Sequence, residues 1–299
     1  MASIKNVAIA GAAGSLGSVV FKQLVNSGKY NVRVLRRLGS QSKYPPGTDV
    51  ADVDFESVDS LKAALAGQDA VVATLATESI GAQKTLIDAS IAAGVKRFLP
   101  SDFGSNLDNP KTRALPVYTQ KVQIQDYLAE KAKTTGLTYT IVYNSAFLDW
   151  GLEKGFILNT SDGKPTIIDG GDLPFSATTL TTVGDAVVAV LAHPEETKNR
   201  AVYIEDIKVT QNQLLAIAKK LAPHKTWQPQ HVKLDDMTAA ADARLKQGLF
   251  DMQTFAPYLF RAVLDQEYGG NFTKTDNELL GLKGKTEKDI AGILEPLLK

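Results

Sequence analysis

Short apolar runs rich in Val and Ile alternate with longer segments of helical period between Ile4 and Tyr143. Continuous apolar runs of this length are typical of strands that are buried on both faces of a parallel sheet. We therefore expect strands at residues 7–10, 32–35, 70–74, 97–100 and 139–143.

Between these strands, apolar residues recur at helical spacing and predict helices at residues 16–27, 58–66, 81–93 and 117–134. A glycine lies where each helix should end, at Gly28, Gly67, Gly94 and Gly136. Glycine commonly supplies the left-handed residue that terminates a helix. The alternation predicts an α/β fold with a Rossmann-type, doubly wound parallel sheet.

The rhythm changes after Asn144, with a Gly-, Pro- and Asp-rich stretch at 159–174 followed by mostly helical segments. We expect residues 1–155 to form the Rossmann domain, with a returning segment near 175–205. Residues 156–299 should form a smaller, helix-rich substrate region. Because such sheets bind ligands at the carboxyl ends of their strands, this region is expected to form the other wall of the pocket.

The composition favours a small-molecule ligand. Lys plus Arg and Asp plus Glu both total 33, so no overall field attracts the chain to nucleic acid or to an anionic membrane. There is no cysteine, which excludes disulfides, thiolate catalysis and zinc sites built on sulfur. The three histidines are dispersed and have no carboxylates at ligand spacing, so we expect no metal site. Neither a secretory leader nor a membrane-spanning stretch is evident, which predicts a cytoplasmic protein, either a monomer or a homodimer.

A glycine-rich loop, Gly11-Ala-Ala-Gly14-Ser-Leu-Gly17, directly follows the first predicted strand and opens a helix. Glycines in such a loop allow a sharp turn and close approach to a pyrophosphate, and the helix N-terminus adds N–H donors. The alternative is a tight turn with no ligand. We expect this loop to bind a dinucleotide through Gly11, Ala13, Gly14, Ser15, Leu16 and Gly17. The Gly-x-x-Gly-x-x-Gly spacing is typical of the short-chain reductase superfamily.

The end of the second strand reads Leu35-Arg36-Arg37, where an NAD-selective site usually carries an acidic residue. A guanidinium pairs bidentately with phosphate, so Arg36, Arg37 and Lys43 favour the 2′-phosphate of NADP(H). The alternative is a solvated basic edge.

Phe98-Leu-Pro-Ser-Asp-Phe-Gly104 resembles the Phe-Leu-Pro-Ser-Glu-Phe-Gly block of isoflavone, pinoresinol and phenylcoumaran benzylic ether reductases. Segments 83–97, 52–57 and 175–185 are also similar to that group, and Lys121 occupies the place of its catalytic lysine. The likeness covers roughly residues 4–205. The cysteine-free chain with Trp150 is most similar to fungal NmrA-like members of these atypical short-chain dehydrogenases/reductases. Two departures are Asp102 in place of Glu and Asn144-Ser145-Ala146-Phe147 in place of Ser-Asn-x-Phe.

The resemblance implies an NADPH-dependent reductase of a small aromatic or conjugated substrate, with Lys121 as general acid/base. It further implies that Thr77, Ser101, Phe103 and Lys121 lie beside the cofactor. We expect Phe103, Asn144, Phe147 and Trp150 to face the substrate. For the aromatic residues, the alternative is packing in the core.

Proton transfer by Lys121 requires its pKa to fall from 10.4 toward about 7 to 8, a change of about 4 kcal/mol that burial can supply. The alternative is an exposed helical lysine. Tyr118 precedes Lys121 by three positions rather than the four of ordinary short-chain dehydrogenases, which disfavours their mechanism and related epimerases. We expect Tyr118 to pack in its helix, and the alternative is that it lines the pocket. We expect Asp102 to cap or shape the loop beside the cofactor. No nucleophile elbow surrounds Ser101, so a hydrolase is disfavoured. A non-catalytic, NmrA-type NADP sensor remains the alternative function, although it would not need a proton donor at position 121.

Overall fold

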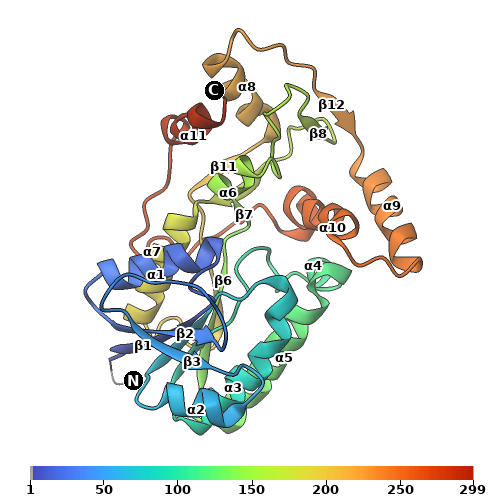
Figure 1. Cartoon of the computed structure of the whole chain (residues 1–299). Helices are drawn as coiled ribbons and strands as arrows, with labels where there is room; N and C mark the ends of the chain where they lie inside the picture. The colour runs from blue at the N-terminus through green and yellow to red at the C-terminus, as the bar shows by residue number, and fades with distance from the viewer. Residues whose placement is uncertain (1–2, 299) are drawn as a thin grey trace.

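The computed structural model describes residues 3–298 and is built on a parallel sheet of the strand order β10-β6-β5-β4-β1-β2-β3 (Figure 1). The strands are β1 (Asn6–Ala10), β2 (Asn31–Arg37), β3 (Asp49–Val53), β4 (Ala70–Ala73), β5 (Arg97–Leu99), β6 (Thr138–Tyr143) and β10 (Arg200–Tyr203). Every pairing in this sheet is parallel. All seven strands therefore end at the same edge.

Helices cover both faces of the sheet. Alternate residues of its central strands point to opposite faces, and the side chains on both faces are buried. Val7 and Ile9 of β1 join the core beneath α1 (Ser15–Asn26) and α7 (Leu180–Ala192). Ala8 and Ala10 join the core on the other face. That second core is covered by α2 (Val58–Leu65), α3 (Gln83–Ala92) and α5 (Thr119–Thr134). The predicted doubly wound α/β class is confirmed.

The five predicted strands and four predicted helices are present, and two further strands of the large sheet were not predicted. β3 and β10 lie at the two edges of the sheet and carry charged residues, so they lack the continuous apolar pattern. Gly28, Gly67 and Gly94 adopt positive φ as expected, at 61°, 75° and 78°. The same expectation for Gly136 is wrong. Helix α5 ends in an extended residue, Thr135, whose φ is −126°, so the chain enters β6 without a left-handed turn.

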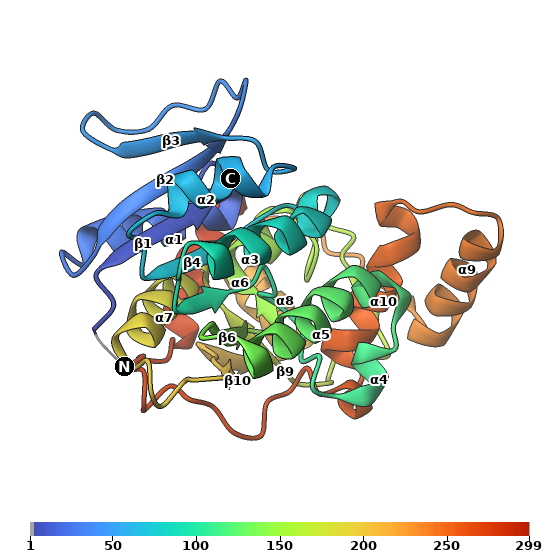
Figure 2. The same cartoon turned by 90° about the horizontal axis from the view of Figure 1, so that it is seen from below.

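The remaining chain builds a second core around a small mixed sheet of β7 (Ala146–Phe147), β9 (Phe175–Thr178) and β11 (Ile207–Val209). A two-stranded sheet pairs β8 (Thr166–Ile168) with β12 (Gln230–Val232). The longer helices here are α6 (Leu148–Glu153), α8 (Gln211–Leu221), α9 (Leu234–Lys246), α10 (Met252–Leu264) and α11 (Glu287–Leu294). Short helical turns complete the chain: η1 (Thr77–Ala82), α4 (Pro110–Arg113), η2 (Pro116–Tyr118), η3 (Gln266–Tyr268) and η4 (Glu295–Leu297). Figure 1 and Figure 2 show α9 and α10 projecting as an arm on the right of the molecule.

The chain returns to the large sheet through α7 and β10 after leaving it at β6. Helix α7 packs along α1, and β10 pairs with β6. None of the helices formed by residues 3–298 has the length and apolar character needed to cross a membrane.

A buried arginine anchors this returning segment. Arg97 of β5 is fully buried and donates hydrogen bonds to the hydroxyls of Thr138, Thr140 and Thr197 and to the carbonyl of Pro194. Burial lowers the pKa of Arg97 to about 10. The guanidinium therefore ties β6 to the loop between α7 and β10.

Replacing Arg97 by Ala should lower the free energy of unfolding by about 3 kcal/mol, because three hydroxyls and a carbonyl lose their donor in the interior. Denaturant titration followed by circular dichroism measures the effect. Arg33→Ala is the matched control. It breaks an ion pair with the exposed Asp49 and should cost less than about 1 kcal/mol. Equal losses in the two variants would contradict the anchoring role of Arg97.

Candidate active site

The glycine loop is held against the end of β4 by two contacts that leave no room for a side chain. A Cβ on Gly17 would lie 2.0 Å from the carbonyl oxygen of Gly11 and 2.6 Å from the hydroxyl of Thr74. Gly11 adopts a φ of 87°, and a Cβ there would lie 2.3 Å from the Thr74 carbonyl oxygen. Thr74 itself donates to the carbonyl of Ala10. Both glycines are therefore required by the packing of the protein.

Gly14 differs because the protein leaves space for a side chain at this position. A Cβ on Gly14 would meet the Gly11 oxygen at 3.5 Å, an ordinary contact. Gly14 caps the N-terminus of α1 without a side-chain hydrogen bond, and the first turn of α1 has no acidic residue. The N–H groups of this turn thus face an uncovered space where the helix dipole favours an anion. Ala13, Ser15 and Leu16 flank that opening, so the loop fits a pyrophosphate.

The two arginines at the end of β2 have different surroundings, since neighbouring strand residues point to opposite faces. Arg36 donates to both carboxyl oxygens of Asp52, at 2.6 and 2.8 Å, and to the carbonyl of Ser42 at 3.1 Å. The hydrogen bond with Asp52 raises the pKa of Arg36, and the same bond lowers the pKa of Asp52. Arg37 is exposed, and its guanidinium has no partner in the described part of the chain. Arg37 is thus the guanidinium that is free to bind a ligand.

Lys43 is exposed on the segment that follows Arg37. It lines a hollow of about 570 Å³ between this segment and α1, together with Ala13 of the glycine loop and Ser42. Lys43 therefore lies next to the glycine loop.

The ends of β4 and β5 supply the next part of the edge. Ser101 is held by two hydrogen bonds: its N–H donates to the side chain of Gln83 at 2.7 Å, and its hydroxyl donates to the carbonyl of Leu75 at 2.8 Å. These bonds tie the two loops together and give Ser101 no histidine partner. Thr77 is exposed at the start of η1, directly after β4.

Lys121 lies in the first turn of α5 and is half-buried. Its amine donates to the carbonyl of Phe103 at 3.2 Å, which places it beside the loop after β5. Burial lowers the pKa of Lys121, and the neighbouring Asp102 partly offsets this effect. Lys121 is therefore not the freely solvated lysine of the alternative interpretation.

Tyr118 is buried and donates its hydroxyl hydrogen to Ser105 at 2.7 Å. It packs with Leu107, Ile141 and Tyr143. The prediction that Tyr118 packs inside the protein is confirmed.

The residues expected to face the substrate differ in burial. Asn144 is fully buried, and its side-chain amide donates to the carbonyl of Ser145, a residue with a φ of 52°. Phe103 is also buried, whereas Phe147 and Trp150 are only half-buried. The Trp150 ring lies 6.5 Å from that of Phe156, which in turn stacks on Phe260 of α10 at 4.6 Å. Aromatic side chains thus connect α6 to the α9–α10 arm.

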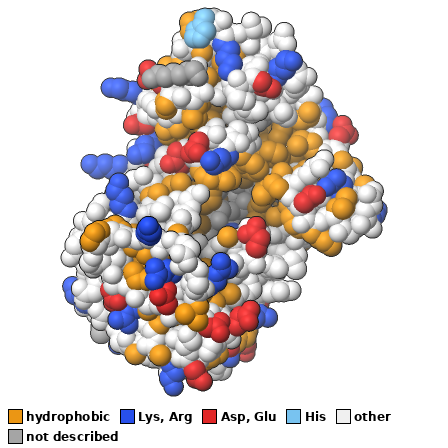
Figure 3. Space-filling view, in the orientation of Figure 1, with side chains coloured by type: hydrophobic (Ala, Val, Ile, Leu, Met, Phe, Trp, Pro, Cys, Tyr) orange, Lys and Arg blue, Asp and Glu red, His pale blue; other side chains and the backbone are white. Residues whose placement is uncertain are grey.

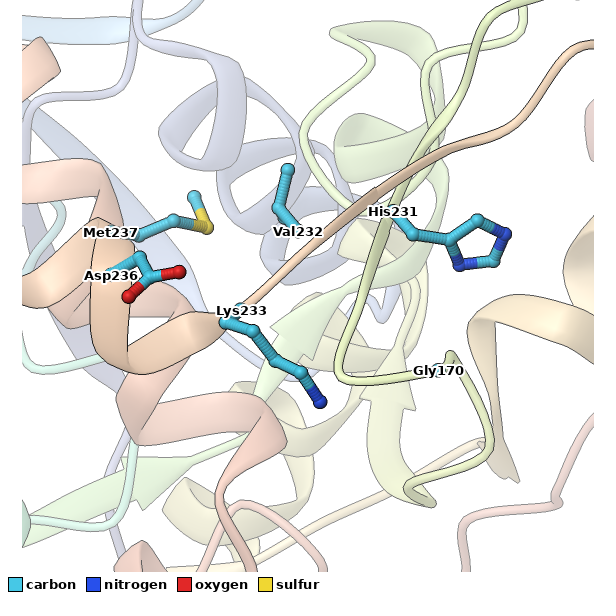
Figure 4. Close-up of a pocket in the computed structure, with 6 residues that line it drawn as sticks. All are labelled: Gly170, His231, Val232, Lys233, Asp236 and Met237. Atoms are coloured by element: carbon cyan, nitrogen blue, oxygen red, sulfur yellow. The ribbon is translucent and has the colours of Figure 1, made fainter.

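Figure 3 shows a hollow between the sheet, the second core and the arm, with apolar side chains around it. A hollow of about 650 Å³ lies between the turn after β8 and the start of α9 (Figure 4). It is lined by Gly170, His231, Val232, Lys233, Asp236 and Met237. In Figure 4 the side chain of His231 points away from that of Met237.

Sequence reasoning missed several residues that shape the site. Asp52 and Gln83 contact predicted site residues from strands or helices distant in the chain. The residues around the β8–α9 hollow carry no recognisable motif, apart from the position of Gly170 in the Gly- and Asp-rich stretch.

Comparisons with known proteins show to which family the chain belongs. The NmrA-like family model matches residues 3–255. Oxidoreductase aprR of Aspergillus flavus is 34% identical over 97% of this chain and 98% of its own length. Isoflavone reductase homolog IRL of Zea mays is 27% identical over 62% of this chain and 61% of its own length.

Among solved structures, AtPrR2 with NADP+ and (+)pinoresinol superimposes with a TM-score of 0.81 at 21% identity and covers 100% of both chains. At this identity the likeness establishes the shared fold. The predicted resemblance is confirmed by the family model and by the relative from Aspergillus flavus. The chain therefore belongs to the NmrA-like family.

Proposed function

We propose that this protein is an NADPH-dependent reductase of a small aromatic or otherwise conjugated molecule. The observation that carries the proposal is the half-buried Lys121, whose amine meets the Phe103 carbonyl at the sheet edge that also carries the glycine loop. A bound NADPH supplies hydride, and the protein must supply orientation and a proton. The relative named as an oxidoreductase and the fold shared with reductase structures support this reading.

The residues at the sheet edge fit the cofactor. The glycine loop from Gly11 to Gly17 would hold the pyrophosphate at the uncovered start of α1. Lys43, which lines the hollow beside that loop, would bind the 2′-phosphate together with Arg37 at the end of β2, because both side chains are exposed. We assign Arg36 a supporting role, since its donors are occupied by Asp52 and Ser42. Thr77, Ser101 and Phe103 would line the rest of the edge.

Lys121 would move the proton. Burial lowers its pKa, which brings the amine closer to the range where it exchanges protons near neutral pH. The Phe103 carbonyl holds the Nζ atom and orients its remaining hydrogens. Phe147 and Trp150 keep partly exposed aromatic surface that would contact an apolar substrate ring.

Gly14→Ala and Gly17→Ala should separate ligand binding from folding. Gly17→Ala should lower the melting temperature of the cofactor-free protein, because its Cβ meets backbone at 2.0 Å. Gly14→Ala should fold normally but bind NADPH about tenfold or more weakly, because its Cβ occupies the space left for the pyrophosphate. Thermal melting and calorimetry measure both effects. Gly81→Ala, which meets nothing within 4 Å, is the control. Unchanged NADPH affinity in Gly14→Ala would reject the proposed cofactor site.

Arg37→Ala should weaken NADPH binding by about 10- to 100-fold, the effect of losing charge-assisted hydrogen bonds to a phosphate. NADH binding should change less than about threefold, since NADH lacks that phosphate. Arg36→Ala is the matched control and should affect the two cofactors similarly. Calorimetric titration with each cofactor measures the ratio. If Arg36→Ala, and not Arg37→Ala, weakened NADPH binding more than NADH binding, Arg36 would be the residue that binds the 2′-phosphate.

Lys121→Met should reduce turnover by about 100-fold or more, the usual contribution of a positioned proton donor, with NADPH affinity within about threefold of the parent protein. The assay follows NADPH oxidation with a panel of phenylpropanoid, quinone and enone compounds. Lys133→Met, at an exposed ion pair on the same helix, should retain activity. Tight NADP binding without turnover of any compound by the parent protein would favour the sensor function over the reductase.

A further inference from the structure

Asp102 is a buried carboxyl group that the proposed mechanism does not yet use. Only 2% of the residue is exposed, and neither carboxyl oxygen has a hydrogen-bond partner of ordinary geometry among residues 3–298. Burial raises the pKa of Asp102 to about 6, although the charge of Lys121 opposes this rise. A buried acidic side chain without hydrogen bonds is unfavourable for folding. We therefore expect a functional reason for a carboxyl group at this position.

The loop around Asp102 holds its carboxyl group in one place. The preceding residue, Ser101, is tied to Gln83 and Leu75 through its backbone and its hydroxyl. The following residue, Phe103, supplies the carbonyl that accepts the Lys121 amine. The loop then joins β6 through the backbone of Gly104, which receives the N–H of residues 144 and 145. Asp102 is therefore fixed one residue away from the group that orients Lys121.

Four other groups act on Asp102 from the elements packed around it. Lys121 and Gln125 of α5 and Arg113 of α4 favour its charged form, whereas Asp108 disfavours that form. Arg113 is already engaged, because it bonds to the side chains of Gln125 and Asp126.

Lys121 differs from Arg113, because its described hydrogen bond goes to a neutral carbonyl. On the β6 side, Tyr143 lies close enough for the charge of Asp102 to raise its pKa. Asp102 is thus the buried carboxyl group that directly precedes Phe103, whose carbonyl binds the Lys121 amine, and its negative charge favours the ammonium form of Lys121.

We propose that Asp102 is the positioning residue that keeps Lys121 in its ammonium form, so that Lys121 acts as the proton donor of the reaction. The inference rests on the proposed role of Lys121. Without a nearby anion, burial would drive the amine toward its neutral form. With Asp102 ionised, the Nζ atom carries the proton that passes to the substrate atom where negative charge develops. Solvent then restores the proton to the amine.

The test measures Lys121 directly in the cofactor-free protein. Lysine amines are labelled by reductive ¹³C-methylation, and the Lys121 signal is identified as the one missing from Lys121→Met. In Asp102→Asn, the midpoint of its NMR titration should move to lower pH by about one pH unit or more. Asp102→Glu retains the charge and should keep the midpoint near that of the parent protein. Asp88→Asn, a partly exposed acid bonded to Tyr127, should also leave it unchanged. An unchanged midpoint in Asp102→Asn would overturn the proposal.

The parent protein provides a second measurement that needs no substitution. If Asp102 faces Lys121, the Lys121 signal should show an additional inflection near pH 6 as the carboxyl group titrates. Its absence would count against the proposal even if Asp102→Asn does not fold.

An activity profile separates this inference from the proposed function. The alkaline limit of kcat/KM should move to lower pH in Asp102→Asn by the same amount as the NMR midpoint. A shifted midpoint in a protein that turns over no substrate would leave the Asp102–Lys121 coupling standing and would sink the reductase function. An unchanged Lys121 midpoint in an active enzyme would overturn the Asp102–Lys121 coupling and leave the reductase function standing.

Discussion

The contact of Gly17 with the Gly11 carbonyl and the Thr74 hydroxyl is the constraint on which the site depends. It presses the first turn of α1 against the end of β4 and leaves the N-terminus of that helix uncovered. A side chain at either glycine would push the helix away from the sheet and tilt its N–H groups. Gly14, on the outer side of the loop, keeps room for a side chain at its Cα. The packing of Gly11 and Gly17 therefore closes the core and also leaves room for an anion at the start of α1.

The parallel sheet then collects the other groups. Because its strands all run in one direction, their carboxyl ends bring together residues that are far apart in the chain. Arg37 ends β2, Thr77 follows β4, and Phe103 follows β5. Helix α5 brings Lys121 to the same loop as Phe103 through one hydrogen bond. In the proposed function, the second core would supply the apolar wall of the substrate site, which is the part of the chain with the weakest sequence pattern.

Much of the fold could be predicted because central strands such as β1 are apolar throughout. The edge strand β3 could not, since its Asp49–Val53 segment is half polar and has a neighbour on one side only. Missing β3 also hid the Arg36–Asp52 pair, which depends on the register between β2 and β3. The sequence pointed to Lys121 through the family resemblance and to the Arg36-Arg37 pair through the end of the second predicted strand. It could not show that one arginine is engaged and the other free, because that depends on contacts across the sheet.

The burial of Asp102 illustrates how the site opposes stability. Its pKa rises from 3.8 to about 6 on folding, so the folded protein binds a proton between about pH 4 and 6 that the unfolded chain has released. The free energy of unfolding therefore falls as pH rises through this window, by about 3 kcal/mol in total at higher pH. An amide in this place would avoid that loss but would leave the Lys121 amine without an anion. The loss of stability is explained if the carboxyl group supplies the counter-charge of the half-buried Lys121 amine, as proposed above. Asp102 would then serve the reaction as well as the structure of the loop.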